Sequence, residues 1–407
     1  MTEGTARPME CEPGHYELAA RGFALRIDLE ELMRTKEEEK RAEPAADNFE
    51  GKRLNEKAVA QKMIEELSSD RYLGLPIDHK SITDSGGQIF RPSADELKAL
   101  CDSVMLRFKA EKGVARPKGR TMVVGDINGN INDLWRAIHA WLSDVVGKGP
   151  GQNIIFLGNI VGPSRRQFEC LILVLAYKTL FPNQVWMLRG SHEEVPLNKD
   201  PKQDKNTTCY DTFYSYITGA NYCKGVEEMF FALFDNMPNV GLIDDRILCV
   251  HGMITLELTK QLLQDGWDVA AKQYETMNKQ LRWNVPSEQV EFCEPNSRRQ
   301  YGNRLGPKAI KGAMERLGVE FVIRGSQMKR NGVKRIGDLP VVTIFSSSGV
   351  RKAVNSSLGA LLFIDPEKNA IMPIFLVNID DKIQTQEEFD EKLAAGWKID
   401  NKEKTRQ

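Results

Sequence analysis

The chain has 407 residues, a hydrophobic fraction of 41% and a formal net charge of −1, which together are typical of a globular protein with a substantial core. The near-neutral charge excludes a global basic field that would hold nucleic acid or an anionic membrane. No apolar run approaches the roughly 18 residues of a membrane span, and the polar N-terminus has no signal-peptide core. We therefore expect an intracellular protein, cytoplasmic or nuclear, that binds neither nucleic acid nor membrane.

Composition divides the chain into three segments. Residues 1–54 are expected to form an N-terminal arm, with a charged helix over 25–41 followed by a linker. Residues 55–378 have the pattern of a folded domain, and residues 379–407 form a polar tail with a short helix. The seven cysteines are scattered without a CxxC pair, which favours reduced thiols over a disulfide framework.

The domain is predicted to begin with two helices and to continue as alternating strands and helices. Asn55 can cap the first helix, and Ser93 with Glu96 forms a capping box for the second. Short apolar runs typical of buried strands lie at 121–124, 154–157, 185–188, 247–250, 321–323, 341–345, 361–364 and 371–377. The last two follow each other closely and predict an antiparallel pair. The expected fold class is a layered α/β protein with central mixed β-sheets flanked by helices.

Glycines and polar residues follow the ends of five of these strands. The sequences are GDING at 125–129, GNIVGP at 158–163, RGSHE at 189–193, HG at 251–252 and RGSQ at 324–327. In open α/β sheets ligands bind at the carboxyl ends of the strands, and glycine lets the backbone approach a ligand closely. These five loops are therefore the candidate site.

In order and spacing, the five motifs resemble the signature of the PPP-family serine/threonine protein phosphatases, and the segments between them look most like the type-1 class. The resemblance spans residues 55–378. It implies the layered fold of calcineurin-like metallophosphoesterases. It also implies a reaction in which two divalent metals, such as Mn or Fe and Zn, acidify a bound water that attacks a phosphate ester.

The residues at the family's metal positions mostly differ from the family pattern. The resemblance places the six ligands at Asp126, Asn128, Asn159, Ser191, His251 and Ser326. Only Asp126 and His251 match the family's residue types. Asn159 replaces a bridging aspartate with a neutral amide, which removes the negative charge that holds two cations close together. We therefore predict no bound metal and no other cofactor.

The positions that handle phosphate in the family are also altered. Gly162 and Pro163 stand where the family has an Asp-Arg pair, whereas His192 and Glu193 retain its catalytic histidine motif. Without a metal-bound nucleophile the histidine has no reaction to assist, so we expect no catalytic residue. The candidate anion contacts are Arg189, Arg298 and Arg324. The resemblance implies a second phosphate-binding arginine in the family, which corresponds here to Arg298 or Arg299.

Three functions remain open. The first is a catalytically inactive phosphatase-like protein, a pseudophosphatase, that acts as a scaffold or regulator for protein partners such as phosphatase regulatory subunits. The second is a weak or altered metal-dependent phosphoprotein phosphatase that holds one metal through Asp126 and His251. The third is a phosphopeptide reader that uses the candidate arginines. Selective change at the metal positions, within an otherwise intact pattern, favours the first.

Overall fold

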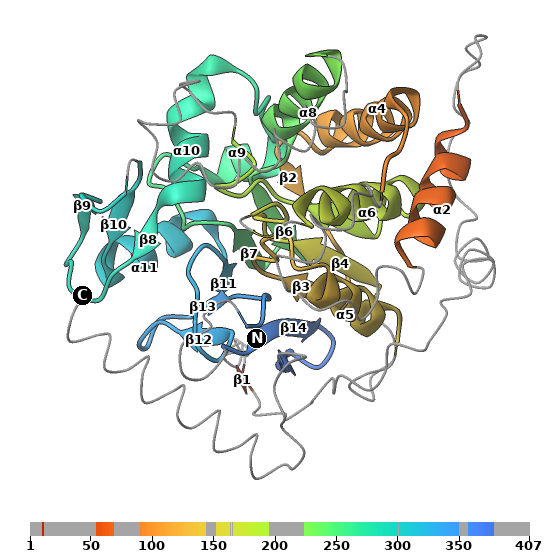
Figure 1. Cartoon of the computed structure of the whole chain (residues 1–407). Coiled ribbons are helices and arrows are strands. Elements are labelled where there is room, and N and C mark those ends of the chain that lie inside the picture. The colour runs from red at the N-terminus through yellow and green to blue at the C-terminus, as the bar shows by residue number, and fades with distance from the viewer. Residues whose placement is uncertain are drawn as a thin grey trace, which may run out of the picture.

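The computed structural model describes residues 10–11, 54–68, 90–143, 152–162, 164, 166–194, 224–299, 301–349 and 357–377. Two six-stranded sheets lie between two layers of helices (Figure 1). This arrangement confirms the predicted fold class of mixed sheets flanked by helices. The helix predicted over 25–41, Pro163 and the tail over 379–407 lie outside the described residues.

The first sheet has the strand order β1-β15-β14-β3-β4-β5. Its strands are β1 (Glu10–Cys11), β3 (Thr121–Val124), β4 (Asn153–Phe156), β5 (Val185–Met187), β14 (Gly359–Asp365) and β15 (Ala370–Leu376). β3, β4 and β5 are parallel, whereas β14 runs antiparallel to β3 and to β15, which confirms the predicted antiparallel pair. β1 lies parallel to β15, with Glu10 opposite Ala370, so part of the predicted arm joins this sheet.

The second sheet has the order β12-β13-β11-β7-β6-β2. Its strands are β2 (Val114–Ala115), β6 (Val240–Ile243), β7 (Ile247–Val250), β11 (Phe321–Arg324), β12 (Val333–Arg335) and β13 (Val341–Ile344). β7, β11 and β13 are parallel neighbours at its centre. A separate small sheet of order β8-β10-β9 contains β8 (Val285–Pro286), β9 (Cys293–Pro295) and β10 (Asn303–Leu305).

Helices cover the outer face of each large sheet (Figure 1). On the first sheet lie α5 (Ile131–Leu142) and α6 (Gln167–Leu180), and α2 (Glu56–Leu67), α4 (Ala94–Glu111) and α8 (Lys224–Asn236) complete the same hydrophobic core. The second packs against α9 (Lys260–Asp265), α10 (Glu275–Trp283), which follows the short 3₁₀ turn η2 (Lys272–Tyr274), and α11 (Pro307–Leu317). In β3, Met122 and Val124 face the helices and Val123 faces the second sheet, because side chains alternate along a strand.

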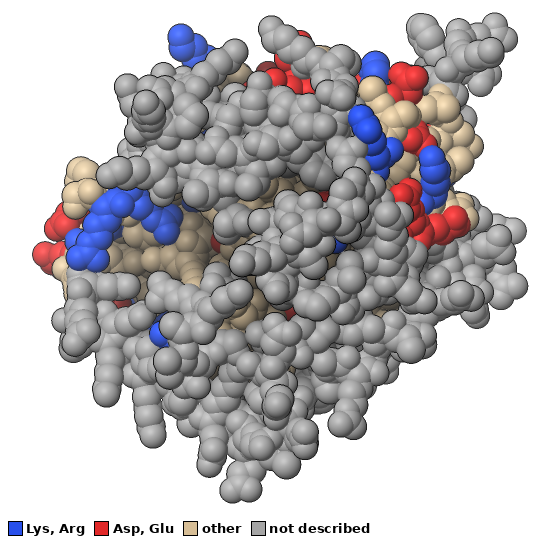
Figure 2. All heavy atoms as spheres, viewed as in Figure 1, with Lys and Arg blue, Asp and Glu red and all other residues tan. Residues whose placement is uncertain are grey.

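Charged side chains of both signs are interspersed on the surface of α2 and α4 (Figure 2). Lys62 pairs with Glu96 at 2.6 Å, and Lys98 pairs with Asp102 at 2.7 Å. Such mixed charge creates no large field of one sign over this surface. Within the described ranges, no helix combines the length and the apolar character needed to cross a membrane.

The capping box predicted at the start of α4 is present and gives a first prediction. The hydroxyl of Ser93 accepts from the Glu96 backbone N–H, and the Glu96 carboxylate accepts from the Ser93 N–H at 2.7 Å. Ser93→Ala is expected to lower the free energy of unfolding by about 1 kcal/mol, because one N-terminal donor of the helix loses its acceptor. Urea unfolding measures this loss, and Ser93→Asp, which can also cap, should retain most of the stability. Equal losses in both variants would contradict the capping role.

Candidate functional site

The loops that follow β3, β4, β5, β7 and β11 meet at one edge of the two sheets, where the sequence placed the candidate site. Hydrogen bonds join residues from all five loops, through side chains in the first four and through the Ser326 backbone N–H in the fifth. Parallel strands of one sheet present their carboxyl ends at the same edge, which accounts for this meeting.

Asp126 lies at the centre of the cluster and is 3% exposed. Its Oδ2 accepts a hydrogen bond from Asn159 Nδ2 at 2.8 Å, and its Oδ1 accepts from the backbone N–H of Ser326 at 2.8 Å. Burial raises the pKa of Asp126 to about 6, although both hydrogen bonds act in the opposite direction. Both carboxylate oxygens are therefore engaged by neutral donors of the chain itself.

His251 forms a second pair of contacts across the cluster. Its Nδ1 lies 3.0 Å from the carbonyl oxygen of Leu157, and its Nε2 lies 3.3 Å from Ser191 Oγ. A carbonyl oxygen only accepts, so the ring proton resides on Nδ1 and the Ser191 hydroxyl donates to Nε2. Burial lowers the pKa of His251 well below its usual value, so the ring is neutral.

The backbone at three of the candidate positions has a left-handed conformation. The φ angles are 53° at Asn128, 52° at Asn159 and 65° at Ser326. Non-glycine residues rarely have positive φ, and asparagine tolerates it best. The Asn128 N–H donates to the Asn159 carbonyl at 2.8 Å, so the first two loops are held together through their backbones. Left-handed turns therefore orient the side chains at these three positions.

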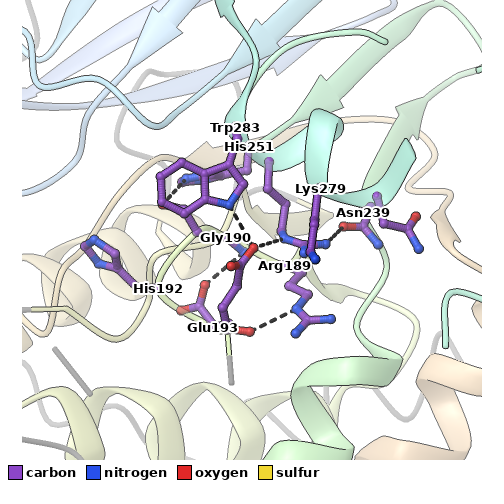
Figure 3. Close-up of polar contacts among 12 residues, drawn as sticks. Arg189, Gly190, His192, Glu193, Asn239, His251, Lys279 and Trp283 are labelled. Atoms are coloured by element: carbon purple, nitrogen blue, oxygen red, sulfur yellow. Dashed lines mark hydrogen bonds and ion pairs between the residues drawn. The ribbon is translucent and has the colours of Figure 1, made fainter. Parts of the chain in front are cut away.

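Glu193 is fully buried, and its carboxylate joins the loops that follow β4 and β5. Its carboxylate accepts from the backbone N–H of Gly190 at 2.8 Å (Figure 3). It also accepts from the backbone N–H groups of Asn159 at 2.8 Å and Val161 at 3.1 Å. Burial raises its pKa to about 7, against the effect of the three donors. The neighbouring His192 has its Nδ1 3.3 Å from the Val161 carbonyl, and burial lowers its pKa. Glu193 therefore has a structural role in this loop.

The candidate arginines have separate environments. Arg189 donates to the Glu193 carbonyl at 2.9 Å and to Asp235 at 2.9 Å (Figure 3). Arg324 is completely buried, where it donates to the Gly252 carbonyl, to Gln327 and to Thr343. Arg298 is exposed. Of the three, Arg324 lies within the cluster, where its guanidinium joins the fourth and fifth loops through Gly252 and Gln327.

Arg299, the residue after Arg298, contacts the cluster through Ser326. Its Nη1 donates to Ser326 Oγ at 3.0 Å, and its Nη2 donates to the Ser326 carbonyl at 3.1 Å. Asn296 fixes the turn, because its side chain accepts from the Arg298 N–H and its carbonyl accepts from the Arg299 N–H. Of the two alternatives that the resemblance leaves for the family's second phosphate-binding arginine, Arg299 contacts the fifth loop and Arg298 is exposed.

The family model of calcineurin-like phosphoesterases matches residues 119–328, which is slightly more than half of the chain. The chain belongs to this family. The matched region contains the five loops described above and so links the family pattern directly to the cluster. The match confirms the calcineurin-like fold family that the five sequence motifs predict.

Two curated relatives from Caenorhabditis elegans are serine/threonine phosphatases by name. Serine/threonine-protein phosphatase C23G10.1 is 26% identical over 258 residues, covering 61% of this chain and 52% of that protein. Serine/threonine-protein phosphatase PP1-delta is 28% identical over 271 residues, covering 65% of this chain and 82% of that protein. The chain thus spans about half the length of the first relative. These likenesses support the PPP-type phosphatase fold.

A solved structure shows the same fold. It is a protein serine/threonine phosphatase from Saccharomyces cerevisiae, described as similar to human phosphatase PP5, and it aligns with a TM-score of 0.61. The alignment covers 79% of this chain and 97% of that chain at 17% sequence identity. At this identity the likeness concerns the fold alone.

The donor groups of this family member do not fit a two-metal centre. Asp126 is the one carboxylate and His251 the one imidazole among the six aligned positions, and hydrogen bonds within the chain engage both. Among the residues that the structure describes, no group of three or more His, Cys, Asp or Glu side chains is arranged to hold a metal ion. Amide and hydroxyl groups of Asn159 and Ser191 supply no charge to offset a divalent cation.

The structure adds a contact that the sequence motifs did not reveal. Glu194, the residue after the third motif, accepts from Arg282 Nε and from Trp283 Nε1, both at 2.8 Å (Figure 3). Arg282 also donates to Asn239 at 2.9 Å. This network fixes α10 against the third loop of the phosphoesterase site. Nothing in the local sequence pattern pairs Glu194 with residues 88 and 89 positions away.

Proposed function

We propose that this protein is a catalytically inactive serine/threonine-phosphatase-like protein that acts as a scaffold or regulator for protein partners. The supporting observation is the hydrogen bond of 2.8 Å between Asn159 and Asp126. In an active relative, the resemblance implies a carboxylate at the Asn159 position and metal ions between the two side chains. Here an amide donates directly to Oδ2 of the carboxylate, at the place where a relative would have metal ions.

The contacts of His251 and Ser191 support the same proposal. A metal-activated water needs open coordination positions next to a strong Lewis acid. In this site the Nε2 of His251 accepts from Ser191, and the Ser191 hydroxyl is also 3.4 Å from Asn159 Oδ1. Second-shell changes alone reduce metal affinity or activity about 10- to 100-fold, and four changed ligand positions should have a larger effect.

The two alternative functions have less support. A single-metal phosphatase would require Asp126 and His251 to exchange their internal hydrogen bonds for a cation, with neutral groups as the remaining neighbours. A phosphopeptide reader would require accessible arginine forks. Arg324 has no exposed surface, and Arg189 is 8% exposed with its donors directed at Glu193 and Asp235.

A phosphatase assay with a matched variant tests the inactive state. The purified chain, loaded with Mn²⁺ and desalted, is expected to hydrolyse p-nitrophenyl phosphate no faster than its His251→Ala variant, with residual rates from contaminants equal in both. Elemental analysis should find less than one tightly held metal ion per chain. A metal-dependent rate that disappears in His251→Ala would instead support the weak phosphatase.

A second measurement concerns the scaffold role. Tagged protein at native abundance in its own cells is expected to co-purify with protein partners in a defined complex, as size-exclusion chromatography and mass spectrometry would show. The same complex should form with His251→Ala, since binding does not require catalysis. Absence of any stable complex in both purifications would count against the scaffold proposal.

A further inference from the structure

The guanidinium group of Arg299, a residue outside the five motifs, contacts the cluster through Ser326. Arg299 follows β9, and its partly buried side chain points toward the loop after β11. Its guanidinium carbon lies 5.9 Å from the ring centre of Trp283, which is within the range of a cation–π contact. Arg298, in contrast, is exposed. The turn therefore separates two adjacent arginines, one inward and one outward.

Ser326 links this guanidinium to the buried carboxylate. Arg299 donates to both the side chain and the carbonyl of Ser326, at 3.0 and 3.1 Å. The backbone N–H of Ser326 donates to Asp126 Oδ1 at 2.8 Å. One residue therefore contacts the cation and the anion at the same time. Its position is one where the family resemblance implies a metal-binding histidine.

Asp126 requires a compensating charge because it is almost completely buried. The donors that contact it directly, from Asn159 and Ser326, are neutral. A buried ionised carboxylate without a nearby cation carries a large desolvation cost. Two arginines act to lower the pKa of Asp126, and Arg324, which donates to Gly252, Gln327 and Thr343, has the larger effect. Arg299 is joined to Asp126 through Ser326, which contacts both side chains.

We propose that Arg299 is, beside Arg324, a resident counter-ion of Asp126, and that its guanidinium takes part of the electrostatic place that bound cations have in a two-metal phosphatase. The contacts of Ser326 with both side chains support this role. The inference rests on the proposed function, since it assumes that no metal ion occupies the site.

A charge series at position 299 tests the proposal by thermal unfolding. Arg299→Met is expected to lower Tm by about 4 °C, and Arg299→Lys, which keeps the charge, by about half as much. Arg299→Gln, which keeps a donor but no charge, should behave like Arg299→Met. The matched control is Arg298→Met, which changes the exposed neighbour and should shift Tm by less than about 1 °C. If Gln preserved Tm as well as Lys does, hydrogen bonding alone would account for Arg299 and the proposal would fail.

A double-mutant cycle gives an independent measurement. In the Asp126→Asn background the buried charge is absent, so Arg299→Met should lower Tm by less than about 1 °C. An equal loss in both backgrounds would overturn the counter-ion role. If Asp126→Asn does not fold, the comparison of Lys and Gln at position 299 decides. A Mn²⁺ titration of the unmodified chain separates this test from the proposed function, because tight Mn²⁺ binding would contradict the proposed function whatever the Arg299 series shows.

Discussion

Asn159→Asp is expected to lower the free energy of unfolding by about 3 kcal/mol at pH 8, although it makes the sequence more similar to an active phosphatase. The substitution replaces the donor Nδ2, which lies 2.8 Å from Asp126 Oδ2, by a second carboxylate oxygen. Two buried carboxylates then face each other without a metal ion between them. Leaving a buried charge uncompensated typically costs about 3 to 5 kcal/mol.

The loss should depend on pH with a definite sign. Burial already raises the pKa of Asp126 to about 6 in the unmodified chain, and a second carboxylate raises the pKa of the pair further. Unfolded carboxyl groups titrate near pH 4, so the folded variant retains a proton that the unfolded chain releases. Stability of the variant therefore falls as pH rises from about 4 through the raised pKa. At pH 5 the difference from the unmodified chain should be small.

Urea unfolding at pH 5 and pH 8 measures this effect. The control is Asn159→Asp combined with Asp126→Asn, which exchanges the amide and the carboxylate and restores one donor between them. That double variant should recover most of the stability at pH 8. Unchanged stability of Asn159→Asp at pH 8 would mean that water or a cation already separates the two side chains.

The central strands could be predicted from sequence because they are buried on both faces. The runs 121–124 and 247–250 match β3 and β7 in full, and side chains on both sides of each strand contact a hydrophobic layer. The small sheet was missed because its strands are two or three residues long, and β9 is mostly exposed and has no apolar alternation. β15 also continues through Pro373, which pairs in register with Leu362 of β14. Proline is tolerated there because the hydrogen bonds of β1 reach only Ala370 and Ile371.

For the site, the motifs identified the loops that meet but not the contacts within them. Asp126, Asn159 and His251 follow the ends of β3, β4 and β7, which the apolar runs located in the sequence. The choice between Arg298 and Arg299 depends on a turn set by Asn296, and adjacent residues in a turn can point in opposite directions. Sequence spacing carries no information on that direction, so the inward arginine appeared only in the structure.

Glu193→Ala is expected to have the largest effect on stability of any single change at the site, about 4 kcal/mol. The carboxylate is the acceptor for three buried backbone N–H groups, and each one left without a partner costs about 1 to 3 kcal/mol. Glu193→Gln should lose about 2 kcal/mol. Its carbonyl oxygen can still accept from Asn159 and Gly190, whereas its amide group would face the Val161 N–H, so one donor loses its acceptor.

The same residue decides how firmly the second and third loops are joined. Chemical unfolding of Glu193→Ala, with the exposed Glu315→Ala on α11 as control, measures the global loss, and the control should change by less than about 0.5 kcal/mol. Amide hydrogen exchange at Asn159, Val161 and Gly190 should accelerate in Glu193→Ala, because these N–H groups lose their acceptor. If exchange stayed slow while stability fell, Glu193 would act through packing alone. Faster exchange at these three positions would show that the carboxylate holds the second and third loops together through its hydrogen bonds.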